Sequence, residues 1–215
     1  MSSAFVITRG ERQEYRHVAS GKTYFSVSQV LEVLMPGTFD NVPKNKLAAT
    51  RERGNDLHYW FAMVLGWKAK LVAQPEAPDG IAGYVAAMMK WADDYSVTPI
   101  LFETPSCSPE YGFAGTVDTL ANCRAYPAYK TPPGADIERF HTIVDLKSGQ
   151  PKAADIVQIQ MYKRLEGYQN AQQMLLLYVK PDGTYKVLPV REAEGDFAWF
   201  LNGVGVLQGR LSRGV

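Results

Sequence analysis

The stretch Ile143-Val144-Asp145-Leu146-Lys147 decides the fold of this 215-residue chain, because it has the composition of a buried strand and yet carries two charges. Side chains alternate between the two faces of a strand, so Val144 and Leu146 share one face while Asp145 and Lys147 share the other. Burying a carboxylate and an ammonium group costs free energy unless partners satisfy them. The sequence therefore predicts an internal strand whose charged end belongs to a functional site.

A second apolar strand that carries a carboxylate comes before this one. It runs from Gly112 to Leu120 and contains Gly115 and Asp118. A glycine inside a strand permits close backbone approach. If the strands with Asp118 and Asp145 are antiparallel neighbours, both carboxylates could lie at one end of a sheet beside Lys147.

Such a pair of carboxylates predicts a site for a hard divalent cation. Asp118 and Asp145 would supply oxygen ligands for Mg²⁺ or Mn²⁺, and the backbone carbonyl of Leu146 could add a third. A bound cation of this kind polarises a phosphate and acidifies a water molecule. Lys147 could then orient or deprotonate that water, or neutralise charge that develops on the phosphate.

The helix expected after this strand, from about Ala153 to Gln169, carries two polar residues one turn apart. Gln158 and Tyr162 are four positions apart and therefore share one helix face. We expect them to frame the site.

An earlier helix, from Lys44 to about Trp67, carries a basic stripe. Lys44, Arg51 and His58 recur every seven residues, which keeps them close to one line along a helix. The two basic residues could contact phosphate or could be a solvated helix face. His58 could be a metal ligand or an ordinary structural histidine.

The order of the remaining elements predicts an α/β fold. Helices come first, then three strands, a helix, two strands and a last helix, which indicates a central mixed sheet flanked by helices. The length fits a single domain over 1–215, with an N-terminal hairpin and helical layer in 1–97 and the catalytic sheet core in 98–215. The other expected elements are a hairpin region within 4–25, a helix capped by Ser26 or Ser28, a helix from Asp79 to Tyr95, strands at 100–103, 140–146, 174–179 and 185–190, and a helix from near Glu192.

Composition limits the class of protein. With 46% hydrophobic and 21% charged residues, the chain resembles soluble globular proteins, and no apolar run approaches the ~20 residues of a membrane span. The N-terminal residues lack a secretory pattern, so we expect a cytoplasmic protein. The formal net charge of +1 means that any basic surface for nucleic acid is local. Two cysteines, Cys107 and Cys123, are too few for a four-cysteine zinc or iron–sulfur site.

The ordered motifs resemble those of a known family. Gly115-x-x-Asp118, Asp145-Leu146-Lys147 and Gln158-x-x-x-Tyr162, with His58 upstream on a helix, resemble the RecB-like branch of the PD-(D/E)xK nuclease superfamily, which includes phage-type exonucleases. The resemblance implies a restriction-endonuclease-like core. It also implies metal ligands at His58, Asp118 and Asp145, a catalytic role for Lys147, and support of the active site or DNA backbone by Gln158 and Tyr162.

This resemblance implies a metal-dependent deoxyribonuclease. An exonuclease on DNA ends or single strands would serve recombination, repair or phage DNA processing, in a bacterial or phage-infected cell and with a possible recombination or replication partner. A structure-specific or restriction-type endonuclease would use the same site. A protein of another class, an inactive nuclease-like module that binds DNA or a partner, is a further alternative.

Two weaker signals stay open. Glu103, near the end of the first sheet strand, could be an additional ligand, although a strand-end charge is the simpler interpretation. Four aromatic residues could stack on unpaired bases, although packing against the sheet and its loop is simpler. They are Tyr111, Phe113, Tyr126 and Tyr129.

Overall fold

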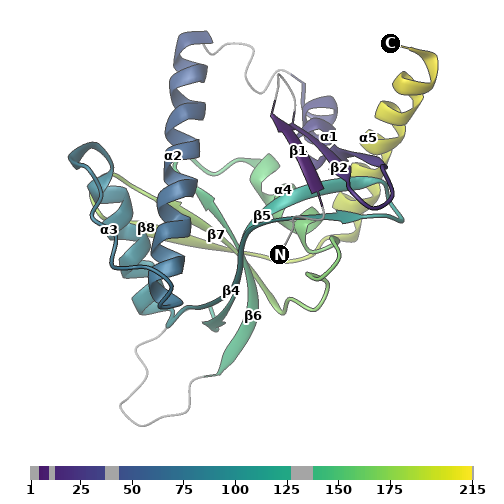
Figure 1. Cartoon of the computed structure of the whole chain (residues 1–215). Coiled ribbons are helices and arrows are strands. Elements are labelled where there is room, and N and C mark those ends of the chain that lie inside the picture. The colour runs from purple at the N-terminus through teal and green to yellow at the C-terminus, as the bar shows by residue number, and fades with distance from the viewer. Residues whose placement is uncertain (1–4, 10–12, 37–43, 127–137, 215) are drawn as a thin grey trace.

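An eight-stranded mixed sheet lies at the centre of the protein, in the order β1-β2-β3-β5-β6-β7-β8, with β4 paired to β5 (Figure 1). This computed structural model describes residues 5–9, 13–36, 44–126 and 138–214, except for the side chains of 9, 13 and 44–51. The strands are β1 Phe5–Arg9, β2 Gln13–His17, β3 Thr23–Ser26, β4 Thr98–Ser108, β5 Phe113–Arg124, β6 Arg139–Lys147, β7 Gln173–Val179 and β8 Tyr185–Val190. The helices are α1 Val27–Leu34, α2 Lys44–Lys68, α3 Asp79–Asp94, α4 Ala153–Tyr162 and α5 Glu194–Arg213.

Strand β5 organises the sheet because three strands pair with it. One edge pairs with β4 in antiparallel register along most of its length. The other edge is shared: parallel pairing with β3 ends at Ala114, and antiparallel pairing with β6 begins at Thr119. Residues 115–118 therefore lie in a fork between β3 and β6. The two carboxylate-bearing strands are antiparallel neighbours, which meets the condition under which both carboxylates could lie at one end of the sheet.

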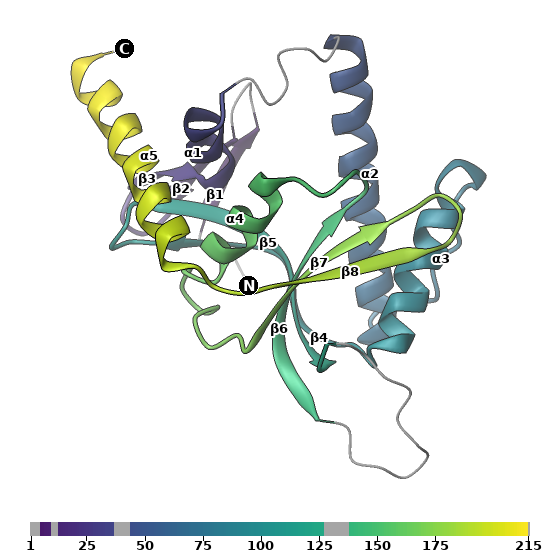
Figure 2. The same cartoon turned by 180° about the vertical axis from the view of Figure 1, so that it is seen from behind.

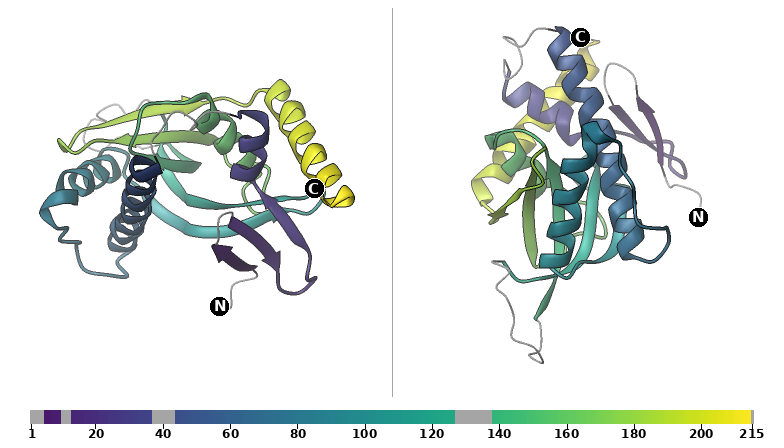
Figure 3. Two further views of the ribbon diagram at one scale, coloured as in Figure 1. Left: turned by 90° about the horizontal axis from the view of Figure 1, so that it is seen from above. Right: turned by 90° about the vertical axis from the view of Figure 1, so that its left-hand side faces the viewer.

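Helices cover both faces of the sheet, as the views from behind and from above show (Figures 2 and 3). Helices α1, α4 and α5 pack on the face that buries Ile143 and Leu176. Helices α2 and α3 pack on the opposite face, which buries Val144 and Leu177. Each such side chain contributes about 1.5–3 kcal/mol when it is fully buried. Because helices cover both faces of the sheet, these strands have nearly continuous apolar sequences. The expected fold class, a mixed sheet flanked by helices, is confirmed.

The start of α1 shows which serine caps the helix. The side chain of Ser26 accepts a hydrogen bond from the backbone N–H of Gln29 at 3.1 Å, and the side chain of Gln29 accepts one from the N–H of Ser26 at 2.8 Å. This reciprocal pair is a capping box. Ser26, rather than Ser28, ends β3 and begins the helix.

The expected helix from Ala153 to Gln169 is shorter than predicted and ends at Tyr162. Turns follow because Gly167 adopts a left-handed φ of 85°. The N–H of Glu166 also donates to the carbonyl of Cys107 on β4 instead of to a helical carbonyl. The last helix likewise begins at Glu194, two residues later than expected.

None of the helices in the described ranges is both long and apolar enough to span a bilayer. Most of the loop expected after β5 lies outside the described residues.

Candidate active site

A hollow of about 730 Å³ opens at the fork in the sheet. Its walls come from α2, the start of α1, the strands β4, β5 and β6, and α4. The residues with titratable or amide side chains that line it include His58, Glu103, Asp118, Asp145, Lys147 and Gln158. Segments that are far apart in the sequence thus bring most of the predicted site residues together.

Asp118 is buried and bridges the two strands at the fork. Its Oδ2 accepts a hydrogen bond from the backbone N–H of Leu146 at 2.6 Å, just beyond the last paired residues of β5 and β6. Burial alone would raise the pKa of this carboxyl group, but the ring of His58, the ammonium of Lys147 and the Leu146 hydrogen bond outweigh it and lower the pKa. Asp118 is therefore an anion in the folded protein.

His58 faces two carboxylates at once. Its Nδ1 lies 3.3 Å from Asp118 Oδ1 and 3.3 Å from Glu103 Oε1. Asp118 is the largest cause that raises the pKa of His58 to about 11, and Glu103 adds to it against the opposing effect of burial. Nδ1 of His58 is thus shared by two carboxylate acceptors.

Glu103 reaches this cluster through an unusual backbone. A register shift in β4 between Pro99 and Leu101 places residue 103 level with Asp118 of β5. Residue 103 itself has a left-handed φ of 46°, which is uncommon for a residue other than glycine. Ligand atoms of His58, Glu103 and Asp118 all lie within 4.8 Å of one another. Reasoning from the sequence favoured a strand-end charge at Glu103, whereas the structure places it in the cluster.

A chain of polar contacts links β6 to α4 at the base of the hollow. Asp145 Oδ2 lies 2.7 Å from Lys147 Nζ, which donates a hydrogen bond to Gln158 Oε1 at 2.9 Å. Gln158 Nε2 in turn donates to Tyr162 Oη at 2.7 Å. Gln158 and Tyr162 therefore frame the site by fixing the position of the Lys147 ammonium.

Asp145 is almost fully buried, with 1% of its surface exposed. Burial raises its pKa to about 7, although Lys147 opposes the increase. Burial also lowers the pKa of Lys147, but the carboxylates of Asp145 and Asp118 outweigh that effect and raise it. Asp145 Oδ2 contacts Lys147 without hydrogen-bonding geometry and has no other hydrogen-bond partner among the described residues. This carboxylate can accept a further cationic ligand.

Gly115 makes room for the ring of Tyr162. A Cβ atom on residue 115 would lie 2.7 Å from Cε1 of that ring. The close approach expected of the glycine from the sequence is thus made by a helix side chain.

The donor atoms fit a hard divalent cation. Carboxylate oxygens with one imidazole nitrogen suit Mg²⁺ or Mn²⁺, and the buried Oδ2 of Asp145 lacks a hydrogen bond. The N–H of Leu146 is used by Asp118, whereas the metal role of its carbonyl stays a prediction. Lys44 and Arg51 belong to α2, but their side chains lie outside the described residues, so their phosphate contacts also stay predictions.

The aromatic residues singled out in the sequence have different environments. Phe113 is fully buried against Phe200, and Tyr111 packs edge-on against Phe197. Tyr126 is exposed, and Tyr129 lies outside the described residues. The packing interpretation holds for the first two.

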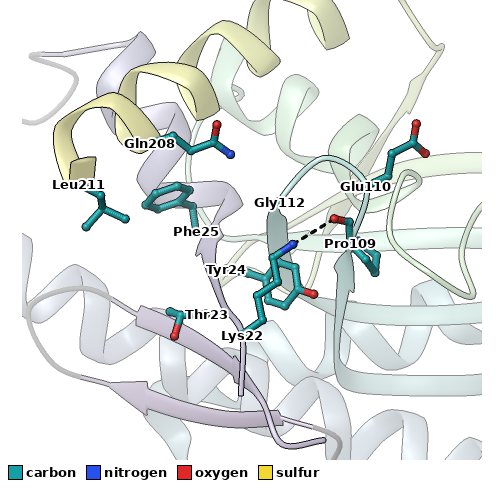
Figure 4. Close-up of a pocket in the computed structure, with 9 residues that line it drawn as sticks. All are labelled: Lys22, Thr23, Tyr24, Phe25, Pro109, Glu110, Gly112, Gln208 and Leu211. Atoms are coloured by element: carbon teal, nitrogen blue, oxygen red, sulfur yellow. Dashed lines mark hydrogen bonds between the residues drawn. The ribbon is translucent and has the colours of Figure 1, made fainter. Parts of the chain in front are cut away.

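A second, smaller hollow of about 270 Å³ lies between β3, the β4–β5 turn and α5 (Figure 4). Lys22 crosses it and donates a hydrogen bond to the carbonyl of Pro109 at 3.3 Å. Glu110 is the only carboxylate in its lining. Among the described residues, this smaller hollow therefore lacks the paired carboxylates that line the larger one.

No model of a known protein family matches the chain, and no curated protein matches it. Solved structures similar to it include an alkaline exonuclease, LHK-Exo, from Laribacter hongkongensis, with a TM-score of 0.49, 13% identity and 88% of each chain covered. The same exonuclease in complex with dAMP gives a TM-score of 0.47 at 14% identity, again over 88% of each chain. The protein SSO0001 gives 0.42 at 12% identity, over 86% of this chain and 75% of its own.

Proposed function

We propose that this protein is a metal-dependent nuclease that hydrolyses phosphodiester bonds in DNA. One observation carries the proposal: two buried carboxylates, Asp118 and Asp145, meet a partly buried lysine, Lys147, in an open hollow at a fork of the sheet. Burying these charges is costly, and their joint placement suits chemistry on a phosphate.

Four side chains would hold the cation. Asp118 would be the central ligand, with donor atoms of His58 and Glu103 within 4.8 Å of its own, and Asp145, which lies outside that close group but lines the same hollow, would be the second carboxylate. The carbonyl of Leu146 is the fifth candidate. When bound, Mg²⁺ or Mn²⁺ polarises the phosphate and lowers the pKa of an attacking water molecule.

Lys147 provides positive charge at the floor of the site. Because its pKa is raised, it is an ammonium group at neutral pH and acts as a hydrogen-bond donor. It would orient the water or neutralise charge that develops on the phosphate oxygens. Gln158 accepts one of its hydrogens and Tyr162 holds Gln158, so the ammonium is oriented before substrate arrives.

The preferred activity is an exonuclease on DNA ends or single strands, in recombination, repair or phage DNA processing. This finer assignment rests on the resemblance of the sequence motifs. Basic residues on α2, Lys44 and Arg51, would contact the DNA backbone.

The test uses purified protein with end-labelled single-stranded, linear double-stranded and closed circular DNA, in Mg²⁺, Mn²⁺ or EDTA. We expect metal-dependent loss of linear substrates that is abolished in Asp145→Asn and Lys147→Ala, while circles survive. Cut circles would instead mean an endonuclease. DNA binding without cleavage in any metal would support the inactive binding module and refute the nuclease.

Matched exposed residues provide the controls. Glu76→Gln and Lys186→Ala change the same charges on exposed side chains outside the hollow, and both should cleave like the wild type. Loss of activity in these controls would show that charge alone, rather than the site, explains the effect.

A further inference from the structure

Tyr59 is an exposed aromatic residue at the wall of the hollow. It follows His58 on α2, lines the hollow, and keeps 59% of its surface exposed. Two other tyrosines line the same hollow, but both are buried: Tyr15 shares a hydrogen bond with Thr116 Oγ1 at 2.9 Å, and Tyr162 accepts one from Gln158. Among the described residues, only Tyr59 offers the hollow an exposed aromatic ring.

The surface of α2 around Tyr59 leaves space for a flat ligand. Gly54 and Ala62 line the hollow on either side of it along the helix. A Cβ atom added to Gly54 would meet nothing within 4 Å, so this part of the helix is open. Trp60 contacts the Tyr59 ring edge-to-face at 5.5 Å between centroids and 82° between planes, which limits the ring's motion.

We propose that Tyr59 stacks on an unpaired nucleobase of a DNA strand whose phosphate lies at Asp118 and Asp145. The proposal rests on the nuclease function above and names its substrate class, single-stranded DNA. Every base has a π-face, so an aromatic platform of this kind holds a strand without reading its sequence. The volume of about 730 Å³ lies in the range of small-ligand pockets, a size that accommodates unpaired nucleotides.

The position of Tyr59 beside the acidic cluster gives stacking a role in the reaction. His58, the preceding residue, contacts Asp118 directly. A base held by Tyr59 would fix the neighbouring phosphate against the site and limit its sliding. Tyr59 is thus a positioning and specificity-determining residue, with no part in the chemistry itself.

The test measures binding of a short fluorescein-labelled oligothymidylate by anisotropy, in EDTA so that the strand stays intact. Tyr59→Ala and Tyr59→Leu should weaken binding by about 5- to 150-fold, the range found for one base stacked on an aromatic ring. Tyr59→Phe keeps the ring and should bind like the wild type. Leu71→Ala, which shortens an exposed apolar side chain outside the hollow, should also leave binding unchanged.

A scan with one abasic residue at successive positions separates stacking from a general surface effect. At one position, loss of the base should weaken wild-type binding about as much as Tyr59→Ala does, and the two losses should not add. Unchanged binding by Tyr59→Ala, or additive losses at every abasic position, would overturn the stacking role. If the wild type still cleaves DNA in that case, the nuclease function stands. A wild type that neither binds nor cleaves DNA would overturn both.

Discussion

Replacing Gly115 with alanine should destabilise the protein and disturb the site, because the added methyl group would meet the ring of Tyr162. The new Cβ would lie 2.7 Å from Cε1 and 3.2 Å from Cδ1 of that ring. Favourable carbon–carbon contacts lie at about 3.5–4.0 Å. The ring cannot retreat freely, since it is 6% exposed and its hydroxyl accepts a hydrogen bond from Gln158.

Two opposing effects set the magnitude. Overpacking a buried position costs about 1–3 kcal/mol of the free energy of unfolding. The change from glycine to alanine also stabilises the protein by about 0.4–1 kcal/mol, because alanine lowers the conformational entropy of the unfolded chain. We therefore expect a net loss of up to about 2.6 kcal/mol, with a midpoint of about 1.3 kcal/mol. Movement of Tyr162 would also release Gln158 and with it the Lys147 ammonium, so DNA cleavage should fall more than stability alone explains.

Urea unfolding in EDTA measures the stability, and DNA cleavage in Mn²⁺ measures the activity. Gly205→Ala on α5 is the matched control, because its added Cβ meets nothing within 4 Å. Alanine is the better helix former by about 1 kcal/mol, so this control should stabilise the protein. Glycine-to-alanine substitution should thus lower the free energy of unfolding at position 115 and raise it at position 205.

A double mutant tests the stated cause. In a Tyr162→Ala background the ring is absent, so Gly115→Ala should no longer destabilise. Equal destabilisation in both backgrounds, or a stabilising effect of Gly115→Ala in the wild type, would refute the steric argument.

Three further predictions concern the charged residues. Asp118→Asn should lower the pKa of His58 from about 11 toward 6.5, so NMR in EDTA should show the ring titrating at lower pH than in the wild type, and an unchanged titration would contradict the pairing. Because folding raises the pKa of His58, its protonated ring stabilises the fold fully below pH 6.5, and this contribution is lost as the pH rises toward about 11. In urea unfolding, the stability advantage of the wild type over Asp118→Asn should therefore shrink over that pH range. Glu103→Gly should raise the free energy of unfolding in EDTA by up to about 1 kcal/mol, because glycine tolerates the φ of 46°. The same substitution should weaken Mn²⁺ binding measured by calorimetry. A loss of stability in EDTA would argue against backbone strain at residue 103. Mn²⁺ at a hundredfold excess over its Kd should raise the free energy of unfolding by about 2.7 kcal/mol and so shift the thermal midpoint upward. Asp145→Asn should lose most of that shift, and equal shifts in the two proteins would exclude Asp145 as a ligand.

Local patterns predicted the strands of the site well. Apolar runs with single carboxylates at Asp118 and Asp145 lie in β5 and β6 as expected, because both faces of the sheet are buried. The spacing of Gln158 and Tyr162 likewise predicted their shared helix face. Their contact with Lys147 could be anticipated because the helix follows the strand after a short connection.

Glu103 was harder to predict because its position depends on an irregular backbone. The β-bulge near Pro99 shifts the register with β5 by one residue. Without that shift, Glu103 would lie level with Val117 instead of Asp118, on the other face of the sheet. The sequence shows no marker for the bulge beyond the proline, and it gives no marker for the left-handed φ.

The predicted end of α4 was wrong for a different reason. Helical periodicity continues past Tyr162 through Leu165 and Tyr168, and both residues are buried in the core. Their burial is achieved by turns, because the N–H of Glu166 pairs with Cys107 of β4. Apolar spacing therefore predicted which residues are buried but not the backbone that buries them.

The sharing of one edge of β5 by β3 and β6 has a consequence for the order of folding. His58 of α2 meets Glu103 of β4 and Asp118 of β5 at that edge, so the acidic cluster depends on contacts between segments 45 and 60 positions apart. Such contacts form slowly because each closes a long loop. A nascent or partly folded chain would hold its carboxylates apart and bind divalent ions only weakly. The proposed site would then assemble late in folding, when the strands close around β5.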